Sequence, residues 1–396
     1  MIFKPLIYSS IILFTGLFNF ACNEEAEVTY NDIDPYAEVN SVFKGKIDLD
    51  NLYNYANQSV PNYITKDNTN TNPISDKAAT LGRVLFYDKK LSVNNQISCG
   101  SCHKQSLAFG DSLTASIGAN GFTSRHSMRL VNARFSTERK FFWDERAATL
   151  EAQTTRPIQD HAEMGFSGLN GDPSINDLIN KLKAVSYYQE LFKFVYGDSE
   201  ITENRLQIAL SQFVRSIQSF DSKYDIGRAQ VANDGQPFPN FTNQENMGKN
   251  MFLTPPQFDV NSNRIGGGLG CGGCHRPPEF DIDPNSLNNG VIGTISGIGN
   301  DLIVTKSPTL RDVVKADGTS NGQFMHNGAS NNLITVIDHY NQISTAGNPN
   351  LDPRLRPGGR GQNLQLMNGQ KDAIVLFLRT LAGSNVYTDP KWSDPF

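Results

Sequence analysis

The chain has 396 residues, of which 38% are hydrophobic and 19% charged, and its formal net charge at pH 7 is −5. This length predicts two domains or one large one, with enough apolar residues for packed cores. The acidic balance, without a block of basic residues, argues against nucleic acid as a partner and is compatible with docking of a basic cytochrome.

The first residues have the pattern of a secretion signal, assigned to residues 1–21. A positive start precedes a mostly apolar run from Ile7 to Phe20, which is shorter than a typical membrane span. The run ends at Cys22, and a small residue before a lone cysteine resembles a lipoprotein cleavage site. We therefore expect an exported protein that meets the membrane only through a lipid anchor on Cys22; an ordinary signal peptide that leaves a spare thiol is the alternative.

The next segment, residues 22–75, is predicted to form an N-terminal tether and arm. The arm runs from Asp50 to Ser75 and is expected to lie extended on the first domain. Helical periodicity begins near Asp76 and returns over residues 176–196. Thr202 then fits an N-cap, because apolar residues follow it at helical spacing.

The second half begins with a Pro- and Asn-rich stretch, residues 234–243, which resembles an inter-domain linker. Thr242 and Glu245 form a capping-box pattern that opens another helix. A strongly apolar helix is predicted over residues 370–381, with Gly383 as its C-cap. No convincing run of alternating strand residues appears, so the fold is expected to be mainly α.

Two copies of Cys-x-x-Cys-His are the most specific feature, and they use four of the five cysteines. They read Cys99-Gly-Ser-Cys102-His103 and Cys271-Gly-Gly-Cys274-His275. This pattern attaches c-type haem: two thiols add to the haem vinyl groups and the histidine becomes the proximal iron ligand. Two zinc or disulfide Cys-x-x-Cys pairs are the alternative. Covalent haem attachment fits an oxidising compartment outside the cytoplasm.

The motifs divide the chain into two similar halves, each with a helix, a haem motif, long loops and a closing helix. We therefore expect a pseudo-repeat of two cytochrome c-like haem domains with long loops. The N-terminal haem domain is assigned to residues 76–235 and the C-terminal haem domain to residues 236–396.

The sequences that flank the motifs resemble those of the bacterial di-haem cytochrome c peroxidases and their MauG-like relatives. The matching segments are Leu81–Asp88, Phe142–Ala147, Gln153, Pro157, Glu163–Gly165, Ser307–Arg311 and Met325–Gly328. The resemblance implies a periplasmic enzyme that reduces hydrogen peroxide at the N-terminal haem. It also implies that the C-terminal haem takes electrons from a small c-type cytochrome or a copper protein (a cupredoxin), and that a homodimer can form.

The resemblance also assigns roles to residues near the first haem. Trp143 matches a tryptophan that lies between the haems and can relay an electron, although a core aromatic is the ordinary alternative. Glu163 matches the distal acid that moves a proton between the peroxide oxygens. Gln153 matches a pocket amide, and Pro157 is expected to shape the wall. His161 is expected to be a surface loop histidine, and the alternative is that it also reaches the pocket.

The first departure from the family pattern is Ala119, which stands where these peroxidases often carry a distal histidine. Alanine cannot ligate iron, so we expect an open N-terminal haem that needs no reductive activation. His126 is the nearest alternative ligand, and it replaces an asparagine that helps the family bind calcium. Calcium prefers hard oxygen ligands, so calcium is a doubtful cofactor here.

The second departure concerns the distal ligand of the C-terminal haem. Counting from the family motif leads to Tyr340, as in MauG-like members, where the peroxidases have methionine. A tyrosinate oxygen favours oxidised iron, whereas methionine raises the haem potential. His339 and Met325 are the alternatives. Arg146 and Arg311 are candidates for pairing with haem propionates.

Two other functions remain open at this point. The first is a MauG-like oxidase that modifies a partner protein, which Ala119 and Tyr340 favour. The second is a di-haem electron carrier without enzyme activity. Glu163 and Gln153 argue against a carrier, because electron transfer alone needs no proton-transfer pocket.

Overall fold

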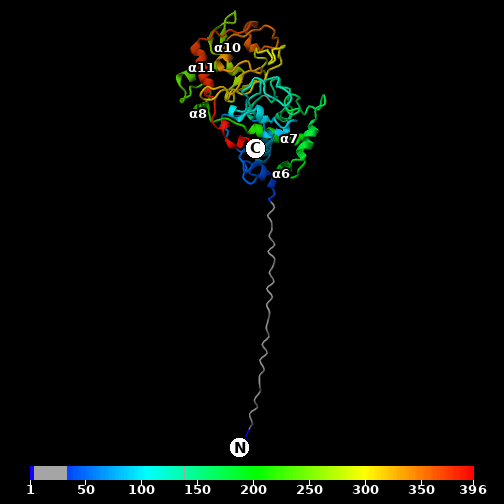
Figure 1. Ribbon diagram of the computed structural model, residues 1–396. Coiled ribbons are helices and arrows are strands. Elements are labelled where there is room, and N and C mark those ends of the chain that lie inside the picture. Colours follow the sequence, from blue (N-terminus) through cyan, green and yellow to red (C-terminus); the bar gives the residue numbers. More distant parts are fainter. Residues whose placement is uncertain (4–33, 138) are drawn as a thin grey trace. The chain divides into compact units, whose positions relative to one another are not determined.

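The computed structural model describes residues 1–3, 34–137 and 139–396 (Figure 1). Residue contacts separate Met1–Pro35 from Tyr36–Phe396, and the description below concerns the latter segment. The predicted signal peptide and the acylation site at Cys22 lie outside the described residues. Within the described part of the chain, no helix has both the length and the apolar character needed to cross a membrane.

The predicted mainly helical fold is confirmed, with only two small antiparallel sheets in the described residues. Strand β1 pairs with β2 and strand β3 with β4, and β3 begins at the histidine of the second haem motif. The helices are α1 (Ala37–Phe43), α2 (Asp76–Tyr87), α3 (Cys99–Cys102), α4 (Leu150–Thr154), α5 (Ile175–Lys183), α6 (Ser186–Tyr196), α7 (Glu203–Ser216), α8 (Lys223–Arg228), α9 (Asn243–Leu253), α10 (Leu333–Asn341) and α11 (Asn368–Arg379). The strands are β1 (Pro256–Phe258), β2 (Arg264–Gly267), β3 (His275–Arg276) and β4 (Asp281–Ile282).

A first hydrophobic core forms where α2 packs against α7. Thr202 caps α7 as predicted, because its hydroxyl accepts a hydrogen bond from the backbone N–H of Arg205 at 3.2 Å. The two helices approach most closely at Gly82, where a Cβ atom would overlap the carbonyl oxygen of Ala209. The position therefore requires glycine, and this contact fixes the helix that leads into the first haem motif.

A second hydrophobic core forms where α9 packs against α11. The predicted capping box is confirmed: the N–H of Glu245 donates to the Thr242 hydroxyl, and the N–H of Thr242 donates to the Glu245 carboxylate. Gly248 plays the same part here as the close-contact glycine of the first core, because its Cβ would overlap the carbonyl oxygen of Ala373. Helix α9 leads into the second haem motif.

The N-terminal part of the expected tether is folded. Residues 37–43 form α1, in which Val39 and Phe43 are buried in the first core. The carboxylate of Glu190 in α6 accepts the N–H groups of Glu38 and Val39, at 3.1 and 2.9 Å, and so caps α1. The prediction missed this helix because a single short amphipathic turn is hard to recognise within a polar segment.

Two other expectations differ from the structure. The stretch 234–243 is more than a linker, because Phe238 and Phe241 are buried in the second core. Gly383 is not the C-cap of α11, which ends at Arg379. A Cβ at Gly383 would collide with the hydroxyl of Ser219, so close packing explains that glycine.

The C-terminal segment returns to the first core. Trp392 is 2% exposed, and its indole N–H donates to the Ser216 hydroxyl at 3.2 Å. The hydroxyl of Tyr55, in the predicted arm, donates to the carbonyl of Lys391 at 2.6 Å. Residues 385–396 therefore pack with the first core, although the sequence placed them with the second domain.

Candidate active site

The second haem motif lies against a cavity of about 630 Å³, which is within the usual range for a bound small molecule. Cys271, Cys274 and His275 line this C-terminal cavity on one side. The cysteines form no disulfide, and burial raises the pKa of the Cys271 thiol to about 12. Two separate thiols and an adjacent histidine beside a large, mainly apolar cavity fit a covalently attached haem.

The first haem motif borders a smaller cavity of about 150 Å³. Its cysteines, Cys99 and Cys102, are also free thiols, and burial raises their pKa values to about 12 and about 11. His103 lines this N-terminal cavity, and its Nδ1 lies 3.1 Å from the carbonyl oxygen of Phe109. A carbonyl can only accept, so Nδ1 carries the proton and Nε2 is left as the ligand atom for iron.

All three predicted catalytic residues share the N-terminal cavity with His103. Trp143, Gln153, Pro157 and Glu163 all line it, although they come from different turns and from α4. The family motifs thus identified side chains that the fold brings together.

Glu163 has the strongest functional signature of this group. Burial, reinforced by the nearby Asp160 carboxylate, raises the pKa of Glu163 to about 7, while Arg146 opposes the shift. Such a value allows a carboxyl group to accept and to donate a proton near neutral pH.

Ala119 contacts Glu163 through its backbone. Its N–H donates to the carbonyl oxygen of Glu163 at 2.7 Å, and its side chain is absent from the lining of the cavity. His161, two residues before Glu163, is exposed and pairs with Asp172 at 2.7 Å, as expected for a surface loop histidine.

Trp143 lies in a wall that the two cavities share. Its indole N–H donates to the carbonyl of His126 at 2.7 Å, and its own carbonyl accepts the N–H groups of Thr305 and Lys306, both at 3.0 Å. The residues that line both cavities are His126, Ser127, Met128, Arg129, Trp143, Lys306, Ser307 and Pro308.

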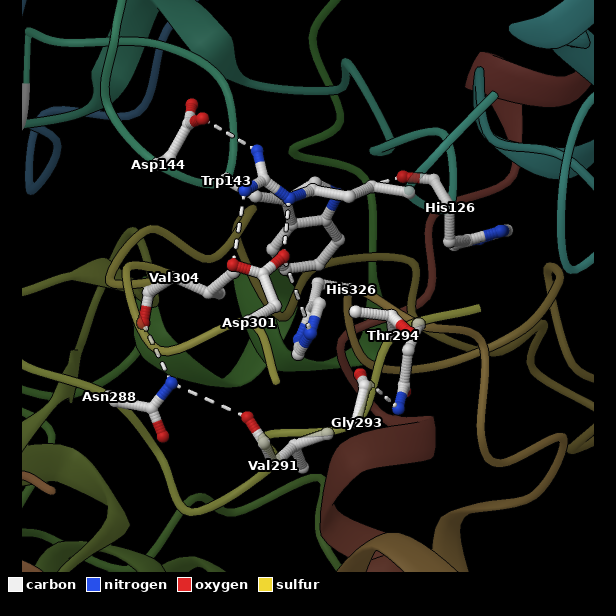
Figure 2. Close-up of polar contacts among 12 residues, drawn as sticks. His126, Trp143, Asp144, Asn288, Val291, Gly293, Thr294, Asp301, Val304 and His326 are labelled. Carbon is white, nitrogen blue, oxygen red and sulfur yellow. Dashed lines mark hydrogen bonds and ion pairs between the residues drawn. The ribbon is translucent and has the colours of Figure 1, made fainter. Parts of the chain in front are cut away.

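Trp143 also faces His326, which comes from the other half of the chain (Figure 2). Their ring centroids are 6.3 Å apart in an edge-on arrangement with an angle of 64° between the planes. The carbonyl of His326 accepts the backbone N–H of His126 at 2.7 Å. The turn that contains Trp143 and the turn that contains His326 are therefore each held by backbone groups of the opposite half of the chain.

An ion-pair cluster lies beside this aromatic contact. The Arg125 guanidinium contacts the carboxylates of Asp144 and Asp301 at 2.6 and 2.7 Å. Asp301 also lies 3.8 Å from Nε2 of His326, as Figure 2 shows. Burial alone would raise the pKa of Asp144, but hydrogen bonds from Arg125 and Arg146 hold it below its usual value.

His126 lies in the wall that the two cavities share. Its Nδ1 lies 2.9 Å from the carbonyl of Leu113, and burial lowers the pKa of His126 to about 4, so the ring is neutral. Its own carbonyl already accepts the Trp143 indole. Among the described residues, no group of three or more His, Cys, Asp or Glu side chains could hold a metal ion.

Two arginines were proposed from the sequence as partners of haem propionates. Arg146 lines the N-terminal cavity, whereas Arg311 is fully buried against Asp225 and lines neither cavity. Arg129 lines both cavities, although no sequence motif pointed to it. Its Nε is buried without a hydrogen-bond partner among the described residues, and burial lowers the pKa of Arg129 to about 10. Arg129 lies three residues after His126, which the sequence had already singled out, and this proximity was the available signal.

The three candidate distal ligands of the C-terminal haem differ in whether they line the cavity. Tyr340 in α10 and Met325 both line the C-terminal cavity, but His339 does not. Nε2 of His339 lies instead 3.0 Å from the backbone carbonyl of Asn289. Burial raises the pKa of Tyr340 above its usual range, and a hydrogen bond from the Asn289 amide opposes this effect. Asn289 is a second residue that the sequence analysis missed.

Known proteins resemble this chain over most of its length. A family model described as "Di-haem cytochrome c peroxidase" matches residues 76–231. The methylamine utilization protein MauG of Methylophilus methylotrophus is 26% identical over 79% of this chain and 84% of its own length. The cytochrome c551 peroxidase of Nitrosomonas europaea is 27% identical over 78% of this chain and 81% of its own length.

Solved structures give the same result for the fold. The crystal structure of a MauG-like protein associated with microbial copper homeostasis is 25% identical, with a TM-score of 0.63, and the match covers 86% of this chain and 99% of that one. The diheme peroxidase BthA of Burkholderia thailandensis shares the fold with a TM-score of 0.61 at 19% identity, over 86% of this chain and 96% of its own. Over most of its length the chain is therefore similar to di-haem cytochrome c peroxidases and MauG-like proteins, and its two Cys-x-x-Cys-His motifs bind two c-type haems covalently.

Proposed function

We propose that the protein reduces hydrogen peroxide to water at the N-terminal haem, with electrons that pass through the C-terminal haem. The electrons would come from a small c-type cytochrome or a copper protein. One observation carries the proposal: Glu163, whose pKa is about 7, lines the same cavity as His103 and Gln153. A pure electron carrier has no use for such an acid beside its iron.

The bound haem supplies a redox-active iron that accepts peroxide, and the protein supplies the proton transfers. Ionised Glu163 accepts the proton of the inner peroxide oxygen and returns it to the outer oxygen, which leaves as water. The Gln153 amide orients the peroxide by hydrogen bonding. Two electrons and two further protons complete the reduction of the peroxide to two molecules of water.

His103 is the proposed proximal ligand at this site. Its Nδ1 proton donates to the Phe109 carbonyl, which fixes the tautomer and leaves Nε2 as the ligand atom. Ala119 offers no ligand atom on the opposite side, so we propose an iron that is open to peroxide without prior reduction.

Trp143 is the proposed relay between the haems. It lines both cavities, and an indole is oxidisable and polarisable. At the second site, His275 is the proposed proximal ligand and Tyr340 the proposed distal ligand, since both side chains line the C-terminal cavity.

We also infer that the two haem sites belong to two related haem domains. Gly82 and Gly248 make the same close contact in the helix that precedes each haem motif. The turns around Trp143 and His326 are likewise closed by equivalent bridges, Phe141 with Ala147 and Phe324 with Ser330. Export and lipid anchoring at Cys22 are further proposals, which mass spectrometry of the mature N-terminus would test.

A MauG-like oxidation of a partner protein is the second candidate function. The position of Trp143 favours it, because a relay in a shared wall can also draw electrons from a protein docked outside. The discriminating measurement is peroxide-driven oxidation of reduced cytochrome c compared with peroxide-driven modification of a partner protein.

The primary experiment is low-temperature EPR with optical spectroscopy on the fully ferric protein, before and after one equivalent of peroxide. We expect one high-spin and one low-spin haem, and rapid reaction without prior reduction. Two low-spin haems that ignore peroxide until one is reduced would contradict the open site and would indicate another distal ligand, with His126 as the first residue to test. Two low-spin haems that ignore peroxide in every redox state would indicate an electron carrier.

A further inference from the structure

Asn289 lies at the distal side of the C-terminal cavity and contacts both side chains that could ligate its iron. Its Nδ2 is 3.2 Å from the hydroxyl oxygen of Tyr340 and 3.5 Å from the sulfur of Met325. All three residues line this cavity. A primary amide nitrogen carries two hydrogens, so one Asn289 side chain can donate to both atoms at once.

The orientation of this amide is set by the surrounding chain. The Asn289 side-chain oxygen accepts the N–H of Val291 at 3.1 Å, which leaves the nitrogen to face Tyr340 and Met325. The neighbouring Asn288 is buried and donates to the carbonyls of Val291 and Val304, as Figure 2 shows. The loop that carries the amide is therefore anchored on the residue just before it.

The backbone of Asn289 also binds His339, the third candidate for the distal ligand. The backbone carbonyl of Asn289 engages Nε2 of His339, whose side chain does not line the cavity. The choice of distal ligand is thus between an oxygen on α10 and a sulfur in the turn before it. Met325 is held in the left-handed region with φ of 67°, and its sulfur is placed by the contact with the Asn289 amide.

The two candidate ligands would give the iron different properties. A phenolate oxygen is a hard ligand that favours ferric iron, whereas a thioether sulfur is soft and raises the haem potential. One coordination position can take only one of them. A group that holds both atoms therefore influences which one binds and how strongly it donates to the iron.

We propose that Asn289 is the positioning residue for the distal side of the C-terminal haem, where it directs the Tyr340 oxygen to the iron and retains the Met325 sulfur on its amide. This inference rests on the proposed role of Tyr340 as the distal ligand. A hydrogen bond to the ligating oxygen also withdraws electron density from it, so the amide moderates the donation of this oxygen to the iron.

The test uses the full-length protein with both haems and the variants Asn289→Leu and Asn289→Asp. Asn289→Asp keeps the shape of the side chain but loses the N–H donor. The inference can therefore still be tested if Asn289→Leu does not fold. We expect a second low-spin EPR signal for the C-terminal haem, with the methionine-to-iron near-infrared band. The ratio of tyrosine-bound to methionine-bound haem should fall by about three- to tenfold, the effect of one hydrogen bond. Adding Met325→Leu should abolish the new signal and leave a lower reduction potential than in the wild type.

The matched control is Asn327→Leu, the same substitution at an amide that donates to the Gly293 carbonyl and does not line the cavity. It should leave the C-terminal haem signal unchanged. Unchanged EPR signal and potential in both Asn289 variants would overturn the inference, provided that Tyr340→Phe alters the same signal. If Tyr340→Phe leaves the C-terminal haem unchanged, the proposed distal ligand itself is wrong.

Discussion

The two haem sites use the same attachment motif but differ in the other side chains that line their cavities. At the first site, His103 shares its cavity with a carboxyl group and an amide, Glu163 and Gln153. At the second, His275 shares its cavity with a phenol and a thioether, Tyr340 and Met325. Groups that move protons suit bond breaking in peroxide, whereas an oxygen or sulfur ligand closes the iron and tunes its potential. In the function proposed above, the two attachment motifs make the sites alike and the other lining residues divide their work.

The turns that meet between the sites show the same contrast. Trp143 and His326 occupy equivalent places in two turns that are closed by equivalent bridges. One turn presents an oxidisable indole, and the other presents an imidazole that is 2% exposed. Of these two side chains, only the indole is suited to relay electrons. The two turns therefore share a backbone framework but differ in the side chain that each places in the wall.

The largest expected effect distinguishes the two distal sides directly. Glu163→Gln should lower the rate of peroxide turnover by about 100-fold or more, the usual contribution of a general acid–base group. Both haems should stay attached, and the EPR signal of the C-terminal haem should not change. The matched control is His161→Gln in the same loop, which should keep wild-type turnover. A loss of twofold or less in the Glu163 variant would remove the acid–base role.

The next effect compares the two cores. Gly82→Ala and Gly248→Ala should each lower the free energy of unfolding by about 2–3 kcal/mol, because the added methyl overlaps a backbone carbonyl of the facing helix. Chemical denaturation followed by circular dichroism measures this loss. Gly369→Ala, in α11, is the control, since nothing lies within 4 Å of its added carbon. Similar losses at the two close contacts would support the proposed repeat, and a loss at only one of them would contradict it.

The pH dependence provides a smaller but sharper test of the first site. The pKa of Glu163 is raised to about 7, and only the ionised form accepts the first proton. The rate of reaction with peroxide should therefore fall about tenfold per pH unit below 7 and level off above it. Stopped-flow mixing of the ferric protein with peroxide measures this profile, and the Glu163→Gln variant should lack it.

The same shift has a consequence for stability with a definite sign. The folded protein retains a proton on Glu163 that the unfolded chain loses above pH 4.5, so this residue destabilises the fold as pH rises from 4.5 to 7. Glu163→Gln should therefore gain stability relative to the wild type across that range. A stability difference that is independent of pH would argue against the raised pKa.

The smallest effect concerns the ion pairs between the halves. Arg125→Met should lower the free energy of unfolding by about 1–2 kcal/mol, because it leaves the partly buried Asp301 carboxylate without its arginine and Asp144 with Arg146 alone. Arg205→Met is the control, since its partner Asp198 is exposed to solvent and the loss should be clearly smaller than for Arg125→Met. Equal losses in the two variants would show that the Arg125 cluster has no special role in joining the halves.

The sequence predicted more of the site than of the packing around it. The residues matched by motif, such as Glu163 and Trp143, do line the expected cavities, because their local sequence carries the family signature. Asn289 and Arg129 were missed because their importance depends on neighbours distant in the chain. Gly383 was misread for the same reason: its close contact is with Ser219, and no local pattern reveals it.

The wall itself has a consequence for the speed of charge transfer. Any group that gains or loses an electron forces its surroundings to readjust, and that readjustment is a barrier. The indole nitrogen and the carbonyl of Trp143 are fixed by three hydrogen bonds to backbone groups of His126, Thr305 and Lys306. Backbone partners have no rotamers to change, so the surroundings of Trp143 would reorganise little when the indole gains or loses charge. The barrier to charge transfer through Trp143 would therefore be low.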